Sequence, residues 1–369
     1  MKIINVASAR PNFMKVAPLL EAYRRYDGQI EAYLLHTGQH YDYEMSKIFF
    51  DELGIPEPDY HLGVGSGTHA EQTARVMVEF EKVLESQRPD WVVVVGDVNP
   101  TMACTIVAKK MGIKVAHVEA GLRSYDRRMP EEINRVLTDS IADLLLTPSI
   151  DGNMNLIKEG IPERKIRFVG NIMIDTLFSM RDRSGESTIL NRLEIQKKEY
   201  VLVTLHRPSN VDRKETLGNF VDILEKTAAE VPTIWPVHPR SKHRAEEFGL
   251  WKRLQSIDNL HLLEPVGYLD NVNLMNNALF VLTDSGGIQE ETTALGVPCL
   301  TARENTERPI TITEGTNTLV GTDPETILKH INRLKENGVA RDRELPRPLY
   351  WDGMTAGRII EALVSYKED

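Results

Sequence analysis

Cysteine is scarce in this sequence. Only two occur among the 369 residues, Cys104 and Cys299, and each lies inside an apolar stretch. One widely separated pair forms neither a disulfide framework nor the closely spaced ligand pattern of a zinc site. We therefore expect two buried thiols, a reducing compartment and no metal.

The sequence also lacks an excess of positive charge and a long apolar run. Its formal charge is −10, which disfavours nucleic acid as a partner because such binding needs a positive field. The longest strongly apolar run, Trp91–Val95, is far too short to span a membrane. Arg10 precedes any apolar core of a secretory leader, so we expect a cytoplasmic protein without membrane contact.

What is present is a regular alternation of short β-branched runs and longer amphipathic stretches. Such alternation is typical of an α/β fold with parallel sheets covered on both faces. The length favours two domains, which we place at residues 1–180, completed by a C-terminal helix over 354–369, and at residues 181–353. The expected strands cover residues 3–8, 30–36, 91–96, 115–119 and 144–147 in the first domain, and 201–204, 233–237, 260–263, 280–283 and 298–300 in the second.

One helix is marked with particular clarity. Thr68 and Glu71 have the spacing of a capping box, and Met77, Phe80 and Leu84 follow at helical intervals. The pattern predicts a helix over residues 68–87.

The loop after the first strand contains no glycine, so it is not a dinucleotide fingerprint. No redox cofactor is therefore expected. Arg10 and Lys15 flank the start of a helix there, and two cations beside free N–H groups suit a phosphate. Solvated surface charge explains the same two residues equally well.

Acidic residues follow three strands of the first half. Asp97 follows the strand WVVVV, and capping of the next helix would explain it as a single residue. Glu119 ends its strand and should border a cleft, because ligands of open parallel sheets lie beyond the carboxyl ends of the strands. Glu131 and Glu132 open a helix, where one glutamate would suffice for the helix dipole. Carboxylates that converge there would repel one another and so supply an acid and a base.

Two histidines follow strands of the second half. His206 stands at the carboxyl end of the first strand, where it could bind a phosphate or move a proton, or be structural. His238 follows the next strand, and we expect this loop to lie farther out.

The strongest local signal is the run Thr-Asp-Ser-Gly-Gly at residues 283–287. A strand ends there, two glycines let a ligand approach the backbone, and a helix begins. Ser285, Gly286 and Gly287 could hold phosphate oxygens, and Glu291 could accept ribose hydroxyls. Ser285 as a simple helix cap is the alternative. Arg308 is a further candidate phosphate ligand.

Taken together, seven motifs resemble one family. They are SARPNFMK, GDVNPT, HVEAGLRS, MPEEINR, TLHRPSN, LTDSGGIQEE and ENTERP, in this order over nearly the whole chain. The chain is similar to the non-hydrolysing UDP-N-acetylglucosamine 2-epimerases. The resemblance implies a glycosyltransferase-B type fold, with two Rossmann-like domains facing across a cleft and a C-terminal helix crossing back.

The resemblance also implies roles and selects Glu131 over Glu132. The implied catalytic residues are Asp97, Glu119, Glu131 and His206, and the implied UDP ligands are Arg10, Lys15, Ser285, Gly286, Gly287, Glu291 and Arg308. It further implies a UDP-sugar as substrate, a homodimer and no cofactor.

The chain departs from the family pattern at several positions. Ser8-Ala9 stands where Gly-Thr is frequent, and Pro208-Ser209 stands where many members carry a second arginine and a glutamate. Some bacterial members have a second, activating UDP-sugar site, parts of which resemble Gln39, His40, Gln72 and His238 here. Glu71 replaces an arginine of that site and would repel a diphosphate.

The activity that this resemblance implies is reversible epimerisation at carbon 2 of UDP-N-acetylglucosamine. Four alternatives stay open at this point. They are a hydrolysing 2-epimerase, a 2-epimerase for a UDP-2,3-diacetamido sugar, a UDP-sugar glycosyltransferase and a UDP-sugar sensor.

Overall fold

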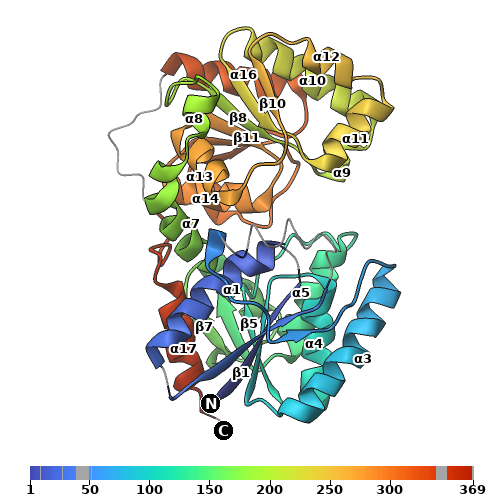
Figure 1. Ribbon diagram of the computed structural model, residues 1–369, viewed down its shortest axis with the longest axis vertical. Coiled ribbons are helices and arrows are strands. Elements are labelled where there is room, and N and C mark those ends of the chain that lie inside the picture. Colours follow the sequence, from blue (N-terminus) through green and yellow to red (C-terminus); the bar gives the residue numbers. More distant parts are fainter. Residues whose placement is uncertain (9, 27, 39–49, 51, 338–346, 368–369) are drawn as a thin grey trace. The chain divides into compact units, whose positions relative to one another are not determined.

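The computed structural model describes residues 1–369 except 9, 27, 39–49, 51, 338–346 and 368–369. Two compact units divide the chain. The N-terminal unit comprises Met1–Thr176 and Leu349–Asp369, and the C-terminal unit comprises Leu177–Pro348. Each contains a parallel sheet with helices on its faces, which confirms the α/β class (Figure 1). Within the described residues, no helix is long and apolar enough to cross a membrane.

The N-terminal unit is built on a parallel sheet that has, in the described part of the chain, seven strands in the order β3-β2-β1-β4-β5-β6-β7. The strands are β1 (Lys2–Ala7), β2 (Glu31–His36), β3 (Tyr60–His61), β4 (Trp91–Val95), β5 (Lys114–Val118), β6 (Leu144–Thr147) and β7 (Ile166–Phe168). The helices are α1 (Arg10–Tyr23), α3 (His69–Gln87), α4 (Asn99–Lys110), α5 (Pro130–Ile141), α6 (Ile150–Lys158) and α17 (Thr355–Val364), with α7 (Ile172–Arg183) leading into the second unit.

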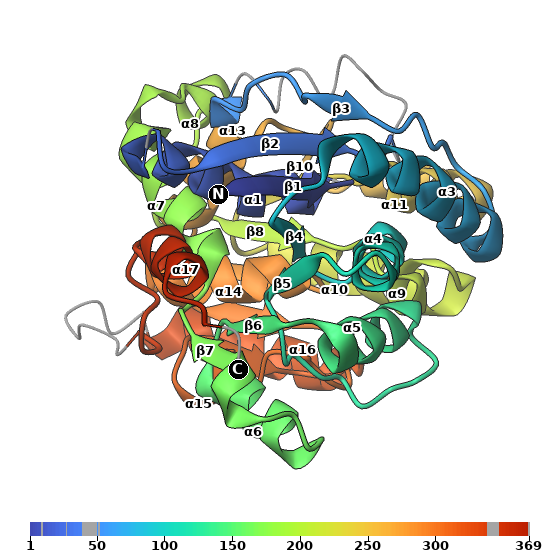
Figure 2. The same cartoon turned by 90° about the horizontal axis from the view of Figure 1, so that it is seen from below.

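Burial on both faces explains why β4 is continuously apolar. Val93 and Val95 pack against α1 and α17, whereas Val92 and Val94 pack against α3 and α4. Figure 2 shows these two groups of helices on opposite sides of the sheet. A strand covered by helices on both faces needs apolar residues at every position rather than at alternate ones.

The last helix, α17, returns to the N-terminal unit, as the resemblance implied. It lies beside α1. Trp351, which precedes it, is buried and donates its indole N–H to the carbonyl of Pro148 at 3.0 Å. Asp175 accepts N–H bonds from Thr355 and Ala356 and so binds the first turn of α17.

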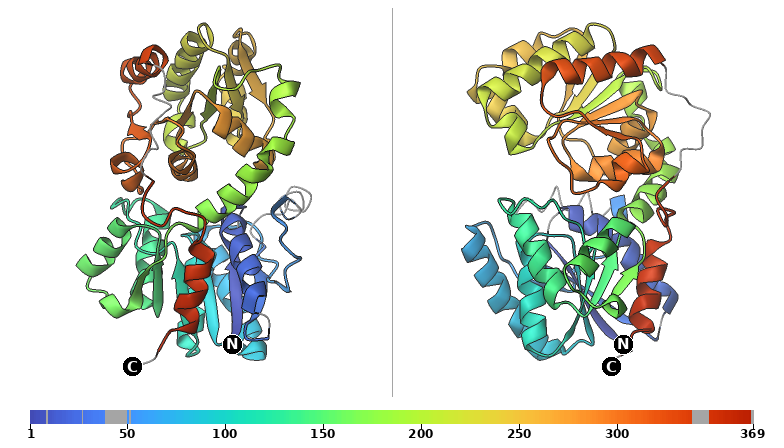
Figure 3. Two further views of the ribbon diagram at one scale, coloured as in Figure 1. Left: turned by 90° about the vertical axis from the view of Figure 1, so that its left-hand side faces the viewer. Right: turned by 180° about the vertical axis from the view of Figure 1, so that it is seen from behind.

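The C-terminal unit has a parallel sheet of six strands, counted over its described residues, in the order β10-β9-β8-β11-β12-β13. The strands are β8 (Val201–Thr204), β9 (Thr233–Pro236), β10 (Leu260–Leu263), β11 (Phe280–Thr283), β12 (Cys299–Thr301) and β13 (Asn317–Leu319). The helices are α8 (Ile189–Arg192), α9 (Pro208–Val211), α10 (Lys214–Ala228), α11 (Pro239–Glu247), α12 (Trp251–Gln255), α13 (Tyr268–Asn277), α14 (Gly286–Leu295), α15 (Ile310–Thr313) and α16 (Pro324–Asn337). In Figure 3, α10 and α16 lie side by side on one face of this sheet.

The expected strands all occur with small shifts at their ends. The three short edge strands β3, β7 and β13 were not expected, because two or three residues carry no readable alternation. The capping box is confirmed: Thr68 accepts the N–H of Glu71, and the Glu71 carboxylate accepts the N–H of Thr68. This also explains the glutamate at position 71 structurally.

Candidate functional site

Strand order locates a candidate site in each unit. In the N-terminal sheet the order reverses between β1 and β4, and in the C-terminal sheet between β8 and β11. Ligands of open parallel sheets bind beyond the carboxyl ends of the strands at such a point. We call the residues that follow β1, β4 and β5, with the start of α5, the N-terminal site. The C-terminal site comprises the residues that follow β8, β11 and β12.

A buried ion pair stands at the centre of the N-terminal site. Lys15 in α1 pairs with Glu119 after β5, and both side chains are less than 10% exposed. Glu119 has a positive φ of 72°, which costs a non-glycine residue about 1–2 kcal/mol. Its N–H and that of Ala120 both bond the carbonyl of Leu146. Strain of this kind is often found at functional positions.

Gly96 makes room for this pair. A Cβ at position 96 would lie 3.1 Å from Nζ of Lys15 and 3.5 Å from Oε2 of Glu119. The residue also has a φ of 69°, which side chains disfavour. Both features favour a glycine where β4 ends.

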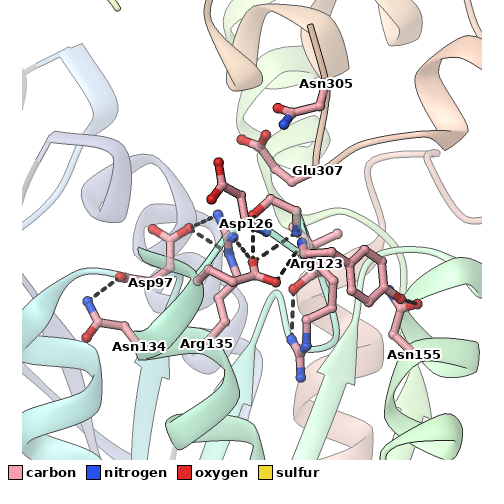
Figure 4. Close-up of polar contacts among 12 residues, drawn as sticks. Asp97, Arg123, Asp126, Asn134, Arg135, Asn155, Asn305 and Glu307 are labelled. Carbon is pink, nitrogen blue, oxygen red and sulfur yellow. Dashed lines mark hydrogen bonds and ion pairs between the residues drawn. The ribbon is translucent and has the colours of Figure 1, made fainter. Parts of the chain in front are cut away.

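Asp97, the next residue, is held by a buried arginine (Figure 4). Nε and Nη2 of Arg135 lie 3.0 and 2.7 Å from Oδ2 of Asp97. Asn134 donates to the carbonyl oxygen of Asp97 at 2.9 Å. The N-cap of α4 is Val98, so capping does not explain the Asp97 carboxylate. That carboxylate is 29% exposed and accessible to a ligand.

The two glutamates at the start of α5 have different surroundings. Glu132 is buried, accepts N–H bonds from Ser124 and Tyr125 at 2.9 Å, and pairs with Arg135 at 2.7 Å. Burial alone would raise the pKa of Glu132, but these N–H groups and the guanidinium lower it. Glu131 is half-buried and bonds no other described residue. The geometry thus makes Glu132 structural and leaves Glu131 accessible.

His206 and Asp284 form the centre of the C-terminal site. Asp284 is fully buried, and its carboxylate accepts the N–H groups of His206 and Arg207 and the amide of Asn210, each within 3.1 Å. Nδ1 of His206 lies 3.0 Å from the same carboxylate. Burial would raise the pKa of Asp284, but the hydrogen bonds and charge of His206 and its neighbours lower it. The imidazole is thereby held with Nε2 directed away from Asp284.

The diglycine turn follows β11. Ser285 occupies the N-cap of α14, yet its hydroxyl accepts no bond from the helix, so the simple cap explanation fails. A Cβ on Gly286 would lie 2.7 Å from Nη1 of Arg308, whereas a Cβ on Gly287 would meet nothing within 4 Å. Packing therefore explains Gly286 and leaves Gly287 without a packing role.

Arg308 belongs to a buried charged cluster. The Glu307 carboxylate forms ion pairs with Arg308 at 2.6 Å, Arg303 at 2.9 Å and Arg207 at 3.7 Å. Arg308 forms a second ion pair with Glu290 at 3.0 Å. Desolvation would raise the pKa of Glu307, but the three guanidinium groups hold it well below its usual range. Three arginines against two glutamates give this cluster positive charge, which favours an anion.

Glu291 is buried one turn into α14. It accepts the hydroxyl of Tyr268 at 2.6 Å. Burial, together with the charge of Glu290, raises the pKa of Glu291 to about 7, although the Tyr268 bond opposes this.

Of the remaining expected residues, Gln72 belongs to α3, His238 lies beside His206, and the others lie outside the description. Gln72 is buried and its amide oxygen accepts from Asn99 at 2.8 Å. His238 caps α11 by accepting the N–H of Arg240, and its ring centroid lies 5.3 Å from that of His206. The expectation that this loop lies farther out is wrong, because β8 and β9 are adjacent. Gln39, His40 and the Arg10 side chain lie outside the described residues.

Sequence reasoning missed several residues that these sites use. Arg135, Asp284, Tyr268 and Glu307 each position an expected residue. Asp284 had a readable signal, since it stands between a strand end and the diglycine turn. Glu307 stands next to Arg308 within the motif ENTERP, whereas Arg135 and Tyr268 meet Asp97 and Glu291 from other segments of the chain and left no such signal. Among the described residues, no group of three or more His, Cys, Asp or Glu side chains could hold a metal ion.

Known proteins match this chain over nearly its whole length. The family model for UDP-N-acetylglucosamine 2-epimerase matches residues 23–364. The chain is 43% identical to the UDP-N-acetylglucosamine 2-epimerase of Methanocaldococcus jannaschii over 98% of this chain and 99% of that protein. It is 38% identical to a UDP-2,3-diacetamido-2,3-dideoxy-D-glucuronate 2-epimerase of Pseudomonas aeruginosa, over 98% and 99%.

A solved structure of the Methanocaldococcus jannaschii enzyme, in complex with UDP-GlcNAc and UDP, superposes with a TM-score of 0.89. It has 42% identity and covers 99% of this chain and 100% of that chain. A family model and relatives that extend over nearly the whole length leave no large segment unmatched. The chain belongs to the UDP-N-acetylglucosamine 2-epimerase family.

Proposed function

We propose that this protein interconverts UDP-N-acetylglucosamine and UDP-N-acetylmannosamine without net hydrolysis. The observation that carries the proposal is a set of three separately positioned carboxylates in the N-terminal site. Asp97 is paired with Arg135, Glu119 is paired with Lys15, and Glu131 has no partner among the described residues. A protein that only bound a diphosphate would gain nothing from such a set.

The proposed reaction begins with loss of UDP. The hydrogen on carbon 2 is not acidic, since no carbonyl adjoins it, so direct deprotonation is too costly near neutral pH. When the bond between carbon 1 and the diphosphate oxygen breaks, the electron pair leaves with UDP. A carboxylate takes the carbon 2 proton, and carbons 1 and 2 become doubly bonded in 2-acetamidoglucal. Reprotonation on the opposite face and re-addition of UDP to carbon 1 complete the epimerisation.

The two sites have complementary chemistry for this route. The cluster of Arg207, Arg303 and Arg308, with the N–H groups of the diglycine turn, would stabilise charge on the departing diphosphate. Glu291 would accept ribose hydroxyls, and His206 would donate from Nε2 to a phosphate oxygen. Asp97, Glu119 and Glu131 would supply the acid and base at carbon 2.

Proton exchange tests the proposal. The protein is incubated with UDP-N-acetylglucosamine in heavy water and the sugar is followed by NMR. We expect deuterium at carbon 2 in two intact UDP-sugars. Free N-acetylmannosamine would instead indicate a hydrolysing enzyme, and absence of exchange would indicate a transferase or sensor.

Variants connect the reaction to the named residues. Asp97→Asn and Glu131→Gln should retain UDP binding and lose exchange by at least about 100-fold, the usual contribution of a general acid or base. Asp143→Asn is the control, because Asp143 bonds Lys109 and the N–H of Val115 at the opposite end of β5. Wild-type exchange in both site variants would contradict the assignment.

A UDP-2,3-diacetamido sugar is the second candidate substrate. It is favoured by the 38% identity to a relative named for such a sugar. The same exchange experiment with each sugar, compared by kcat/KM, decides between them.

We also propose a homodimer, formed through α5. Ile133, Leu137 and Ile141 are 48%, 43% and 36% exposed and recur every four residues on one face. Beside them lies an apolar groove of about 520 Å³ that includes Met77 and Met102. Light scattering should give a dimer mass that Leu137→Glu converts to a monomer, whereas Val364→Glu should leave it unchanged. A monomeric wild type would exclude this interface.

A further inference from the structure

His117, a histidine with no role expected from the sequence, lies in β5 two residues before Glu119 of the N-terminal site. His117 in β5 is fully buried. Its Nδ1 lies 2.6 Å from Oδ1 of Asp139, and its Nε2 lies 2.8 Å from the carbonyl oxygen of Gly96. A carboxylate and a carbonyl oxygen only accept hydrogen bonds. Both contacts therefore require an N–H, and the imidazolium form makes both bonds at once.

The network continues from Asp139 on α5. Oδ2 of Asp139 accepts the N–H of Gly121 at 3.1 Å and Nη1 of Arg123 at 2.7 Å. Arg123 binds both oxygens of Glu159 at 2.8 and 2.7 Å. Charges thus alternate from Asp139 through Arg123 to Glu159, so these charges compensate one another.

The residues that His117 and Asp139 bond lie in the segments that carry the proposed acid and base groups. Gly96 immediately precedes Asp97, and Gly121 lies two residues after Glu119. Asp139 lies on α5, the helix that begins next to Glu131. The backbone at Gly96 and at Glu119 is left-handed, a conformation that neighbouring contacts must maintain.

We propose that His117 and Asp139 are positioning residues, which hold the turn at Asp97, the turn at Glu119 and helix α5 in one fixed arrangement. This inference rests on the proposed function. A buried ion pair contributes little stability compared with apolar packing of the same volume. The location of the His117–Asp139 pair between the turn at Asp97, the turn at Glu119 and helix α5 indicates that the pair fixes the positions of these three segments. Displacement of a catalytic group by about 1 Å can cost about 100-fold in rate.

Graded variants test the role. His117→Gln retains one donor, His117→Phe retains none, and Asp139→Asn removes the carboxylate that His117 contacts. We expect kcat for the C2 exchange to fall about 10-fold in His117→Gln and about 100-fold or more in His117→Phe. KM and the Kd for UDP should stay within about twofold, because the C-terminal site is unaltered. Asp143→Asn, which breaks a comparable carboxylate network at the other end of β5, should leave kcat unchanged.

Hydrogen exchange provides a readout that needs no activity. In the His117 variants, amides of residues 96–98 and 119–123 should exchange at least about tenfold faster, while those of residues 113–115 stay protected. A kcat within threefold of wild type in folded His117→Gln and His117→Phe, or unchanged protection of both turns, would overturn the inference. A wild type that exchanges no carbon 2 proton refutes the proposed function instead, and the amide protection still decides the positioning role.

Discussion

Glu291→Gln should make the C-terminal unit more stable at pH 8 but not at pH 4. Glu291 is 3% exposed, and burial with the charge of Glu290 raises its pKa from 4.5 to about 7. In the unfolded chain the same carboxyl ionises near its ordinary value. Between these two values the folded state therefore holds a proton that the unfolded state has released, so stability decreases as pH rises from about 4.5 through 7.

The magnitude follows from the two pKa values. Each unit of difference between the folded and unfolded pKa corresponds to about 1.4 kcal/mol, so ionising Glu291 in the folded state costs about 3 kcal/mol above pH 7. A glutamine has nearly the same shape, and its amide oxygen can still accept the Tyr268 hydroxyl. The variant therefore avoids the cost of the buried charge and keeps the bond.

Denaturant titration at pH 4, 5, 6, 7 and 8 measures this difference. The chain has two units, so unfolding of the C-terminal unit is followed by hydrogen exchange of peptides from β11 and α14 rather than by a global signal. The free energy of unfolding of Glu291→Gln minus that of wild type should be near zero at pH 4 and increase to about 3 kcal/mol at pH 8. Glu314→Gln, an exposed glutamate of the same unit, is the control for loss of one charge.

A difference that does not change between pH 4 and 8, or that has the opposite sign, would refute the reasoning. The Kd for UDP provides a second check that depends on the proposed ribose contact. Ribose hydroxyls donate to the ionised carboxylate, so wild-type affinity should increase from pH 6 to 8 and that of Glu291→Gln should not.

Two further predictions concern local geometry. Gly286→Ala should weaken UDP binding at least about tenfold, because the new Cβ would lie 2.7 Å from Nη1 of Arg308 and displace its guanidinium. Gly287→Ala should fold as well as wild type, since its Cβ would meet nothing within 4 Å. Calorimetric titration with UDP and thermal melts measure the two effects. Trp351→Phe loses the bond to the Pro148 carbonyl and should reduce stability by about 1–2 kcal/mol, with faster amide exchange in α17 as the sign that the C-terminal helix is less firmly held.

Local sequence determined much of the fold. The run WVVVV indicated a strand, and Thr68 and Glu71 marked the start of α3. These features depend on contacts between residues a few positions apart, so their signals lie within short windows. The candidate residues after each strand were likewise readable, because parallel strands bring their carboxyl ends to one edge.

Tertiary structure decided what each candidate residue contacts. Spacing alone gave Glu131 and Glu132 equal claims, and only the fold brings Ser124, Tyr125 and Arg135 to Glu132 and leaves Glu131 accessible. Lys15 and Glu119 are 104 positions apart, and His206 and Asp284 are 78 apart. The sequence by itself thus determined where strands, turns and candidate groups occur. Their ion pairs, burial and pKa values depend on partners from distant segments, which only the folded chain brings within a few ångströms.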